Sequence, residues 1–125
     1  MEVPKTYTHA WVYRLERDML TIAGEGKPVA PSFSNSAGTG FEGHEFFEAS
    51  SIRKAGDKYY FIWSSYYGHE LCYAVAPSPE GPFEFGGTII SNGDIGIGGI
   101  TDENDCNNYI GNNHGSIEKI GGKWY

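Results

Sequence analysis

The sequence has little cysteine, little positive charge and no long hydrophobic run. Two cysteines among 125 residues are too few for a disulfide framework, so we expect two free thiols rather than a bridge. Nine Lys and Arg against 16 Asp and Glu give a net charge of −7 without a basic stripe, which argues against nucleic acid as a partner. With no apolar run of about 18 residues, no membrane-spanning helix is expected.

Two further signals are missing. The N-terminus, MEVPKTYTHAW, has no basic start followed by an apolar stretch, so no signal peptide is visible and a cytoplasmic location is favoured over an extracellular one. The glycine-rich stretch at 93–99, GDIGIGG, lacks the following helix and the Lys of a phosphate-binding loop, so no nucleotide site is expected there.

Glycine and aromatic residues are abundant. The chain holds 18 glycines, 15% aromatic residues and 39% hydrophobic residues, which is enough apolar mass for a core. This combination is typical of short strands joined by tight turns. Strand signals are densest in EASSIRK (48–54), KYYFIWS (58–64), LCYAVA (71–76) and FEFGGTII (83–90), which predict an antiparallel four-stranded meander.

The segment before this meander is less regular. HAWVYRL at 9–15 predicts a strand, 17–19 a turn and 20–23 a second strand. Residues 24–44 are rich in glycine, proline and serine and predict a long loop.

The sequence also repeats itself. SIRKAGDKYY at 51–60 and SIEKIGGKWY at 116–125 match at Ser, Ile, Lys, Gly, Lys and Tyr, 65 residues apart. The first strand signals, at 9–22, resemble those of 69–85 in the same way. Repeats longer than about 40 residues, each a four-stranded meander, are typical of a β-propeller.

We therefore expect an all-β fold that is part of a β-propeller. Residues 1–23 would end one blade, residues 45–90 would form a full blade, and residues 113–125 would start the next. A sheet edge that stops within a strand leaves unpaired backbone, so we expect a fragment of a larger protein whose missing blades pack on this one.

Candidate chemistry is concentrated in GHEFFEASS at 43–51, at the start of the blade's innermost strand. Inner strands line the channel of a propeller, where ligands bind. A carboxyl group held against aromatic rings loses hydration and is more readily protonated, as a general acid requires. Glu48 is the candidate; the alternative is a solvated Glu at a strand end.

The repeat alignment places His114 near Glu48. His114 comes two residues before the Ser that matches Ser51, and Glu48 comes three residues before Ser51. Both are expected at the starts of innermost strands, facing one channel, where His114 would bind substrate, a metal or a carboxylate. The alternative is a His hydrogen-bonded in a turn.

Aromatic residues follow the second strand of the meander. Tyr66, Tyr67 and His69 would either stack on a bound ligand or contact a neighbouring blade. A zinc set drawn from His69, Cys72, Cys106 and His114 is too scattered in the sequence to be expected.

The stretches at 46–65, 69–91 and 112–125 resemble glycoside hydrolase family 43, over nearly all of residues 9–125. They hold an E-A-S acid motif before a hairpin, an S-P-x-G-P turn and an N-H-G-S motif one blade later. The resemblance implies an inverting hydrolase on a five-bladed β-propeller. Its expected substrates are arabinose- or xylose-containing plant polysaccharides and oligosaccharides.

The resemblance also implies residue roles. The Glu of E-A-S matches Glu48, which would be the general acid. The His of N-H-G-S matches His114, which would lie on the propeller axis, near a structural calcium held through water. Phe47, His69 and His114 are the expected substrate contacts, and no cofactor is required.

The sequence departs from the family in one respect: no Asp here matches the family's base or the Asp that tunes the acid. An inverting mechanism needs a second carboxylate about 6.5–9.5 Å from the first. We therefore expect these residues alone to be inactive. The alternatives are a non-catalytic carbohydrate-binding propeller and an interaction propeller in which Glu48 is merely solvated.

Overall fold

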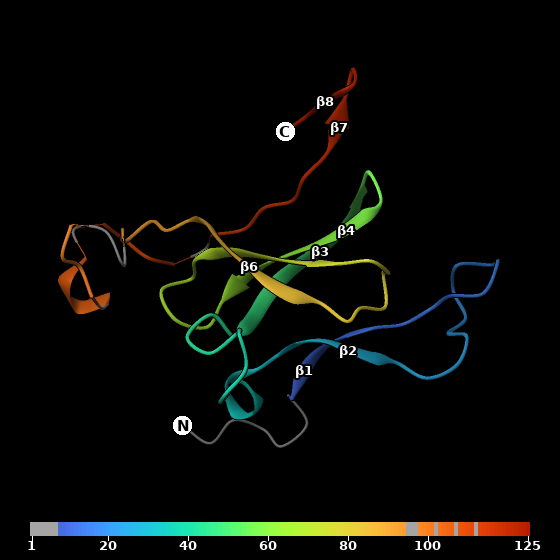
Figure 1. Cartoon of the computed structure of the whole chain (residues 1–125), viewed down its shortest axis with the longest axis horizontal. Coiled ribbons are helices and arrows are strands. Elements are labelled where there is room, and N and C mark those ends of the chain that lie inside the picture. Colours follow the sequence, from blue (N-terminus) through green and yellow to red (C-terminus); the bar gives the residue numbers. More distant parts are fainter. Residues whose placement is uncertain (1–7, 95–97, 102, 107, 112) are drawn as a thin grey trace.

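The computed structural model describes residues 8–94, 98–101, 103–106, 108–111 and 113–125. Across these ranges the chain is all-β, with two single 3-10 turns (Figure 1). No helix in them has the length and apolar character needed to cross a bilayer. The elements are β1 His9–Val12, β2 Lys27–Pro31, η1 Phe33–Asn35, β3 Phe46–Ala55, β4 Lys58–Ser65, β5 Leu71–Ala76, β6 Glu84–Ile90, η2 Glu103–Asp105, β7 Lys119–Ile120 and β8 Lys123–Trp124.

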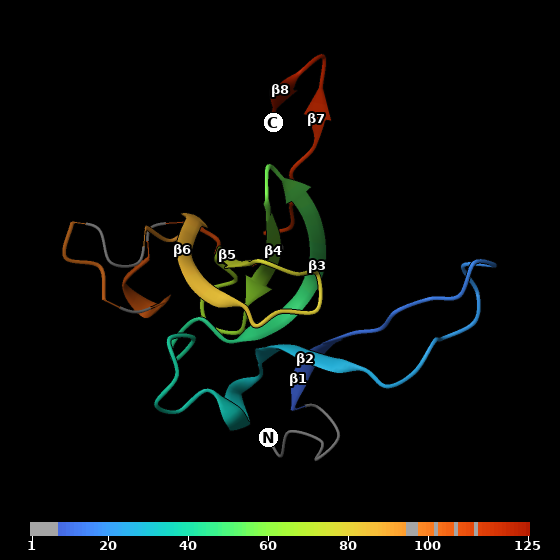
Figure 2. The ribbon, with the colours of Figure 1, turned by 45° about the vertical axis from the view of Figure 1, so that its right-hand side comes forward.

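Strands β3 to β6 form one antiparallel sheet in the order β3-β4-β5-β6, seen side by side in Figure 2. This confirms the four-stranded meander predicted from the sequence, with every boundary within two residues of the prediction. Strand β4 is covered on both faces, since residues 61–65 are all buried. Burial on both faces explains why its sequence is continuously aromatic and β-branched before the final serines.

The hydrophobic core lies between the meander and the β1–β2 pair. Trp63 is fully buried and stacks on Phe61, with ring centroids 5.3 Å apart. Val29 and Ala30 of β2 belong to the same buried cluster, and so does Phe46 at the start of β3. The start of β3, which leads into the candidate site, is therefore anchored in the core.

The long loop predicted for residues 24–44 is wrong in its first part. Strand β2 lies there and pairs antiparallel with β1, with Ala10 opposite Ala30. Val29 and Ala30 are only 7% and 1% exposed, so tertiary packing outweighs the local glycine and proline signals. The prolines of β2 are tolerated because β2 pairs on one side only.

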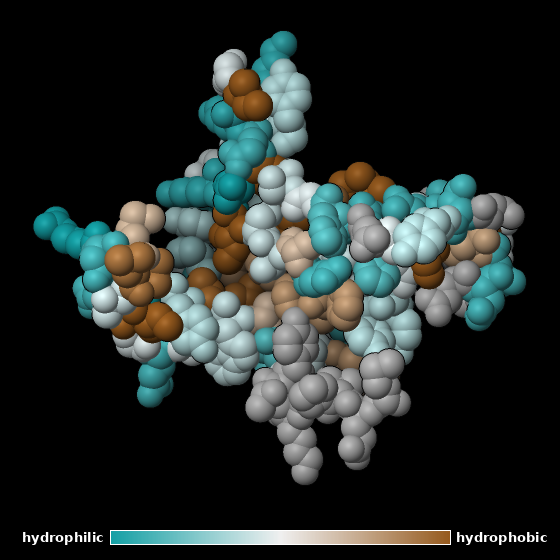
Figure 3. Space-filling model, turned by 180° about the vertical axis from the view of Figure 1, so that it is seen from behind, coloured by the Kyte–Doolittle hydropathy of each residue, from teal (hydrophilic) through white to brown (hydrophobic). Residues whose placement is uncertain are grey.

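The strand predicted at 20–23 is also wrong. Among the described residues, the segment at 20–23 pairs only through a single antiparallel bridge between Ile22 and Leu15. The carboxylate of Asp18 accepts a hydrogen bond from the backbone N–H of Leu20 at 2.9 Å, which favours a turn over strand pairing. Leu20 is 87% exposed. In Figure 3 the hydrophobic side chains of this connection gather at the left, away from the core.

The second copy of the repeat also forms a hairpin. Strands β7 and β8 are joined by Gly121 and Gly122, whose positive φ values of 57° and 84° suit a two-residue hairpin turn. Strand β7 spans only two residues, because the described residues place no partner strand beside the segment that precedes it. The hairpin projects from the meander (Figures 1 and 2), and Arg53 Nε donates to Glu118 Oε1 at 2.6 Å.

Candidate active site

Strand β3 is irregular where it carries Glu48. Its register against β4 shifts twice, between Phe46 and Glu48 and again between Glu48 and Ser51. Ala49 has a φ of +55°, a conformation that costs a residue with a Cβ about 1–3 kcal/mol. Bulges of this kind re-aim side chains and are frequent beside active sites. The strand thus presents Glu48 outside the regular alternation of inward and outward side chains.

Glu48 and His114 are in direct contact, although 66 residues separate them in the chain. The Nε2 atom of His114 lies 3.0 Å from Oε1 of Glu48. The side chains are 42% exposed for Glu48 and 52% exposed for His114, so both are open to a ligand. The repeat alignment placed these two residues on one channel, and the structure brings them together.

The segment that carries His114 is held against the meander on both sides of it. Asn113 Nδ2 donates to the carbonyl oxygen of Ile90 at 3.4 Å. Gly115 packs so closely on Leu71 that an added Cβ would lie 2.8 Å from Leu71 Cδ2. These contacts fix the position of His114 even though it lies outside any strand.

Next to Glu48 lies an aromatic group formed by Phe33, Phe47, Tyr66, Tyr67 and His69. The rings of Phe47 and His69 meet edge to face with centroids 5.1 Å apart. Tyr66 stacks on Phe33 at 5.4 Å and meets Phe47 at 5.8 Å. Phe33 and Tyr66 are 46% and 39% exposed. Sequence analysis missed Phe33, because it lies in the 3-10 turn η1 inside a predicted loop.

Glu45, the other acid beside the two Phe residues, has a structural role. It is only 2% exposed, and its Oε1 accepts hydrogen bonds from the Ser36 hydroxyl at 2.7 Å and the Gly43 N–H at 2.9 Å. These bonds close the loop that leads into β3. Of the two acids, Glu48 is therefore the one available to a substrate.

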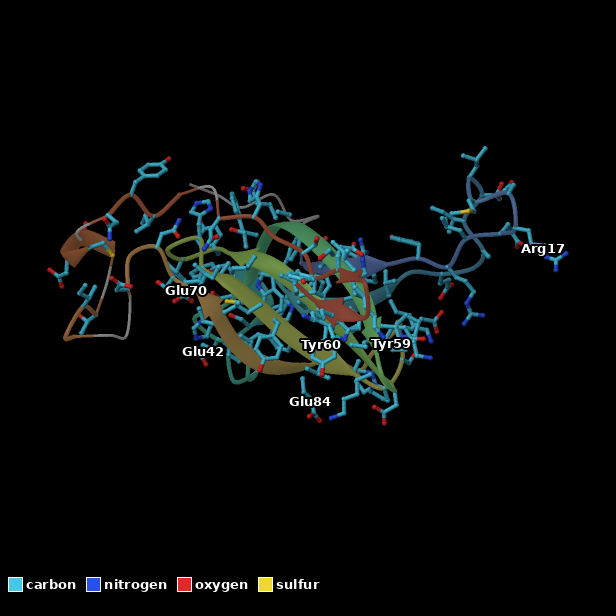
Figure 4. All side chains as sticks on the ribbon, turned by 90° about the horizontal axis from the view of Figure 1, so that it is seen from above. Arg17, Glu42, Tyr59, Tyr60, Glu70 and Glu84 are labelled. Atoms are coloured by element: carbon cyan, nitrogen blue, oxygen red, sulfur yellow. The ribbon has the colours of Figure 1, made fainter. Side chains whose placement is uncertain are left out.

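A second polar cluster lies beneath the start of β3 and was not predicted. His44 Nδ1 is 2.8 Å from Glu70 Oε2, and Cys72 Sγ is 3.9 Å from both atoms. The hydrogen bond to Glu70 raises the pKa of His44, and burial raises the pKa of the Cys72 thiol to about 12. Figure 4 shows Glu70 near one end of the meander, with Tyr59 toward the other. Cys72 and Cys106 form no disulfide, as predicted.

Two sequence observations fall partly outside the described residues. Residues 95–97 of the glycine-rich stretch and residues 1–7 of the first predicted blade segment are not described.

Comparisons with known proteins show what the chain is similar to. No family model matches the chain. The chain is 54% identical over 108 residues to a xylosidase/arabinosidase of Thermoclostridium stercorarium, covering 86% of this chain and 23% of that protein. It is 40% identical over 109 residues to a β-xylosidase of Xylanibacter ruminicola, covering 87% and 27% respectively.

Solved structures show the same likeness. The RS223 β-xylosidase matches with a TM-score of 0.66 and 28% identity, over 94% of this chain and 32% of that one. CoXyl43 matches with a TM-score of 0.63 and 26% identity, over 97% of this chain and 34% of that one. It is a GH43 β-xylosidase/α-arabinofuranosidase from a compost metagenome, solved with xylotriose in a calcium-free form.

Over most of its length the chain is therefore related to xylosidases and arabinosidases, and one of the solved relatives, CoXyl43, is a GH43 enzyme. The chain spans about a quarter of the length of the two curated relatives.

Proposed function

We propose that this chain supplies the acid side of a glycosidase active site. The complete protein would be a five-bladed propeller that hydrolyses O-glycosidic bonds in arabinose- or xylose-containing plant polysaccharides and oligosaccharides. In this proposal the β3–β6 meander is one blade, flanked by the end of the preceding blade and the start of the next. The observation that carries the proposal is the 3.0 Å contact between Glu48 and His114, two residues of motifs that lie far apart in the chain.

Glu48 is proposed to protonate the oxygen of the leaving group. It lies on β3, an edge strand of the meander, exposed enough to reach a bound sugar and held at a bulge that fixes its direction. His114 would orient the Glu48 carboxyl group through their hydrogen bond. An inverting reaction also needs a base about 6.5–9.5 Å away that activates water, and we assign that base to another part of the propeller.

The aromatic group beside Glu48 is proposed to bind the sugar chain. Phe47 and His69 would contact the sugar at the bond that breaks, and Tyr66 and Phe33 would extend this surface toward the leaving-group side. Support comes from the exposure of Phe33 and Tyr66 and from the ring contacts that Tyr66 and His69 make with Phe47. Exposed, pre-arranged aromatic faces lose little conformational entropy when a sugar ring stacks on them.

A structural calcium near His114 is a further part of the proposal. Calcium prefers about six to eight oxygen ligands, so an imidazole would hold it through water rather than directly. The acid role of Glu48 does not depend on this ion.

The first test compares the 125-residue chain with a longer protein that contains it and completes the propeller. We expect the longer protein to hydrolyse an aryl xyloside or aryl arabinofuranoside. The chain alone should show no turnover above background, because Glu48 has no partner base. If the 125-residue chain hydrolyses the substrate and its Glu48→Gln variant does not, the need for a distant base is contradicted. A longer protein that binds xylo-oligosaccharides without cleaving them would favour the non-catalytic propeller.

Replacing Tyr66 with Ala tests the aromatic group. In the longer protein we expect KM for xylo-oligosaccharides to rise about 2- to 10-fold, because a stacking contact worth about 0.5–1.5 kcal/mol is lost. Tyr109→Ala is the matched control, since Tyr109 is 78% exposed and lies outside the aromatic group. A fall in thermal stability with no change in KM would instead mean that Tyr66 contacts a neighbouring blade.

A further inference from the structure

Three different metal-ligating side chains converge beneath the start of β3, away from the Glu48–His114 pair. They come from two segments: His44 precedes β3, and Glu70 and Cys72 lie at the start of β5. Cys72 is fully buried and the Glu70 side chain is 7% exposed, whereas the His44 side chain is 34% exposed and leaves a route from solvent. The cluster combines an imidazole, a carboxylate and a thiol, which is a donor set that zinc accepts.

The three donor atoms have the spacing of a metal site. Their separations of 2.8, 3.9 and 3.9 Å form a triangle whose centre is about 2.1 Å from all three atoms. Zinc binds imidazole nitrogen and carboxylate oxygen at about 2.0–2.2 Å and thiolate sulfur at about 2.3 Å. An ion slightly off this plane meets all three distances. Thr88 Oγ1, 3.3 Å from Glu70 Oε2 and 3.6 Å from Cys72 Sγ, is placed as a fourth donor.

The donors are held in place before any ion arrives. The His44 ring stacks on Phe85 with centroids 4.7 Å apart and planes 16° apart. The His44 carbonyl oxygen accepts a hydrogen bond from Trp63 Nε1 at 3.0 Å. The Glu70 N–H donates to the Ser65 hydroxyl at 3.0 Å. Outer contacts of this kind orient metal ligands and strengthen binding.

We propose that His44, Glu70 and Cys72 form a binding site for a zinc-class divalent cation, with Thr88 or water as the fourth ligand. This inference is independent of the glycosidase function. On binding, the Cys72 thiol gives its proton to solvent and the thiolate coordinates the ion. The ion would link the segment before β3 to the start of β5. It would therefore brace the strand that presents Glu48, only four residues beyond His44.

The test uses the 125-residue chain under reducing conditions after removal of metals. Cobalt(II) serves as the probe, because a cysteine-bound cobalt ion gives a thiolate-to-metal charge-transfer absorption. We expect one cobalt ion per chain with this absorption, its displacement by one equivalent of zinc, and a rise in the thermal midpoint with zinc. Absence of bound cobalt and zinc at micromolar concentrations would overturn the proposal.

Variants separate this site from other donors. Cys72→Ser should remove the charge-transfer absorption, and His44→Gln should weaken cobalt binding at least about tenfold, as loss of a ligand does. The Cys106→Ser and His114→Gln variants should retain both the charge-transfer absorption and the cobalt affinity. An absorption that survives in Cys72→Ser, or that is lost in Cys106→Ser, would refute the assignment. If Cys72→Ser does not fold, His44→Gln still tests the site. An unchanged cobalt affinity in the His44→Gln variant would also refute the assignment.

Discussion

Replacement of Glu48 with Gln is expected to lower kcat/KM on xylo- and arabino-oligosaccharides by about 10²- to 10⁴-fold in a protein that contains these residues within the complete propeller we propose. Gln cannot give a proton to the leaving oxygen but keeps the size of Glu and a hydrogen bond to His114. The loss would therefore report the proton transfer rather than the fold. Steady-state rates on xylobiose, with thermal midpoints of both proteins, measure it.

The matched control for this substitution is Glu118→Gln. The Glu118 side chain is 51% exposed and pairs with Arg53, away from the Glu48–His114 contact. Exposed ion pairs contribute about 0–1 kcal/mol, so its rate should stay close to that of the unchanged protein. Equal rates for Glu48→Gln and Glu118→Gln would mean that Glu48 is only a solvated strand residue.

The second large effect is on stability. Trp63→Ala is expected to lower the free energy of unfolding of the chain by about 3–5 kcal/mol. Trp63 is fully buried between aromatic rings, and its Nε1 donates to the His44 carbonyl oxygen. The substitution removes that hydrogen bond and leaves a cavity under β3. Urea denaturation followed by circular dichroism measures the change.

Trp124→Ala is the matched control, because the same residue type is replaced at a position that is 44% exposed. Its effect should stay near about 0.5 kcal/mol, as is usual for exposed sites. A Trp63→Ala effect no larger than this would contradict the placement of Trp63 in the core.

The strands of the meander were predictable because local and tertiary preferences agree there. The KYYFIWS run is aromatic and β-branched, and β4 is buried on both faces. Strand β2 was not predictable, because its sequence, KPVAP, has the proline content of a loop. What makes it a strand is the burial of Val29 and Ala30 against residues far along the chain, which no local pattern reveals.

The candidate site was predictable only in part. Internal repetition placed Glu48 and His114 near the starts of matching strands, facing one channel, but it did not predict the direct contact between them. The bulge and the positive φ of Ala49 carry no sequence signal, since alanine rarely adopts this conformation. The His44–Glu70–Cys72 cluster joins the segment before β3 to the start of β5, and only the pairing of the strands brings these two segments together.

The central claim is that Glu48 donates a proton to the leaving group. The way in which kcat/KM of the Glu48→Gln variant depends on the leaving group tests this claim most directly. We would measure kcat/KM for Glu48→Gln and the unchanged protein on a dinitrophenyl glycoside and a phenyl glycoside of the same sugar. A dinitrophenolate leaves without proton assistance, so we predict a loss below about tenfold there and a loss of about 10²-fold or more on the phenyl glycoside. Equal losses on both substrates would contradict the claim.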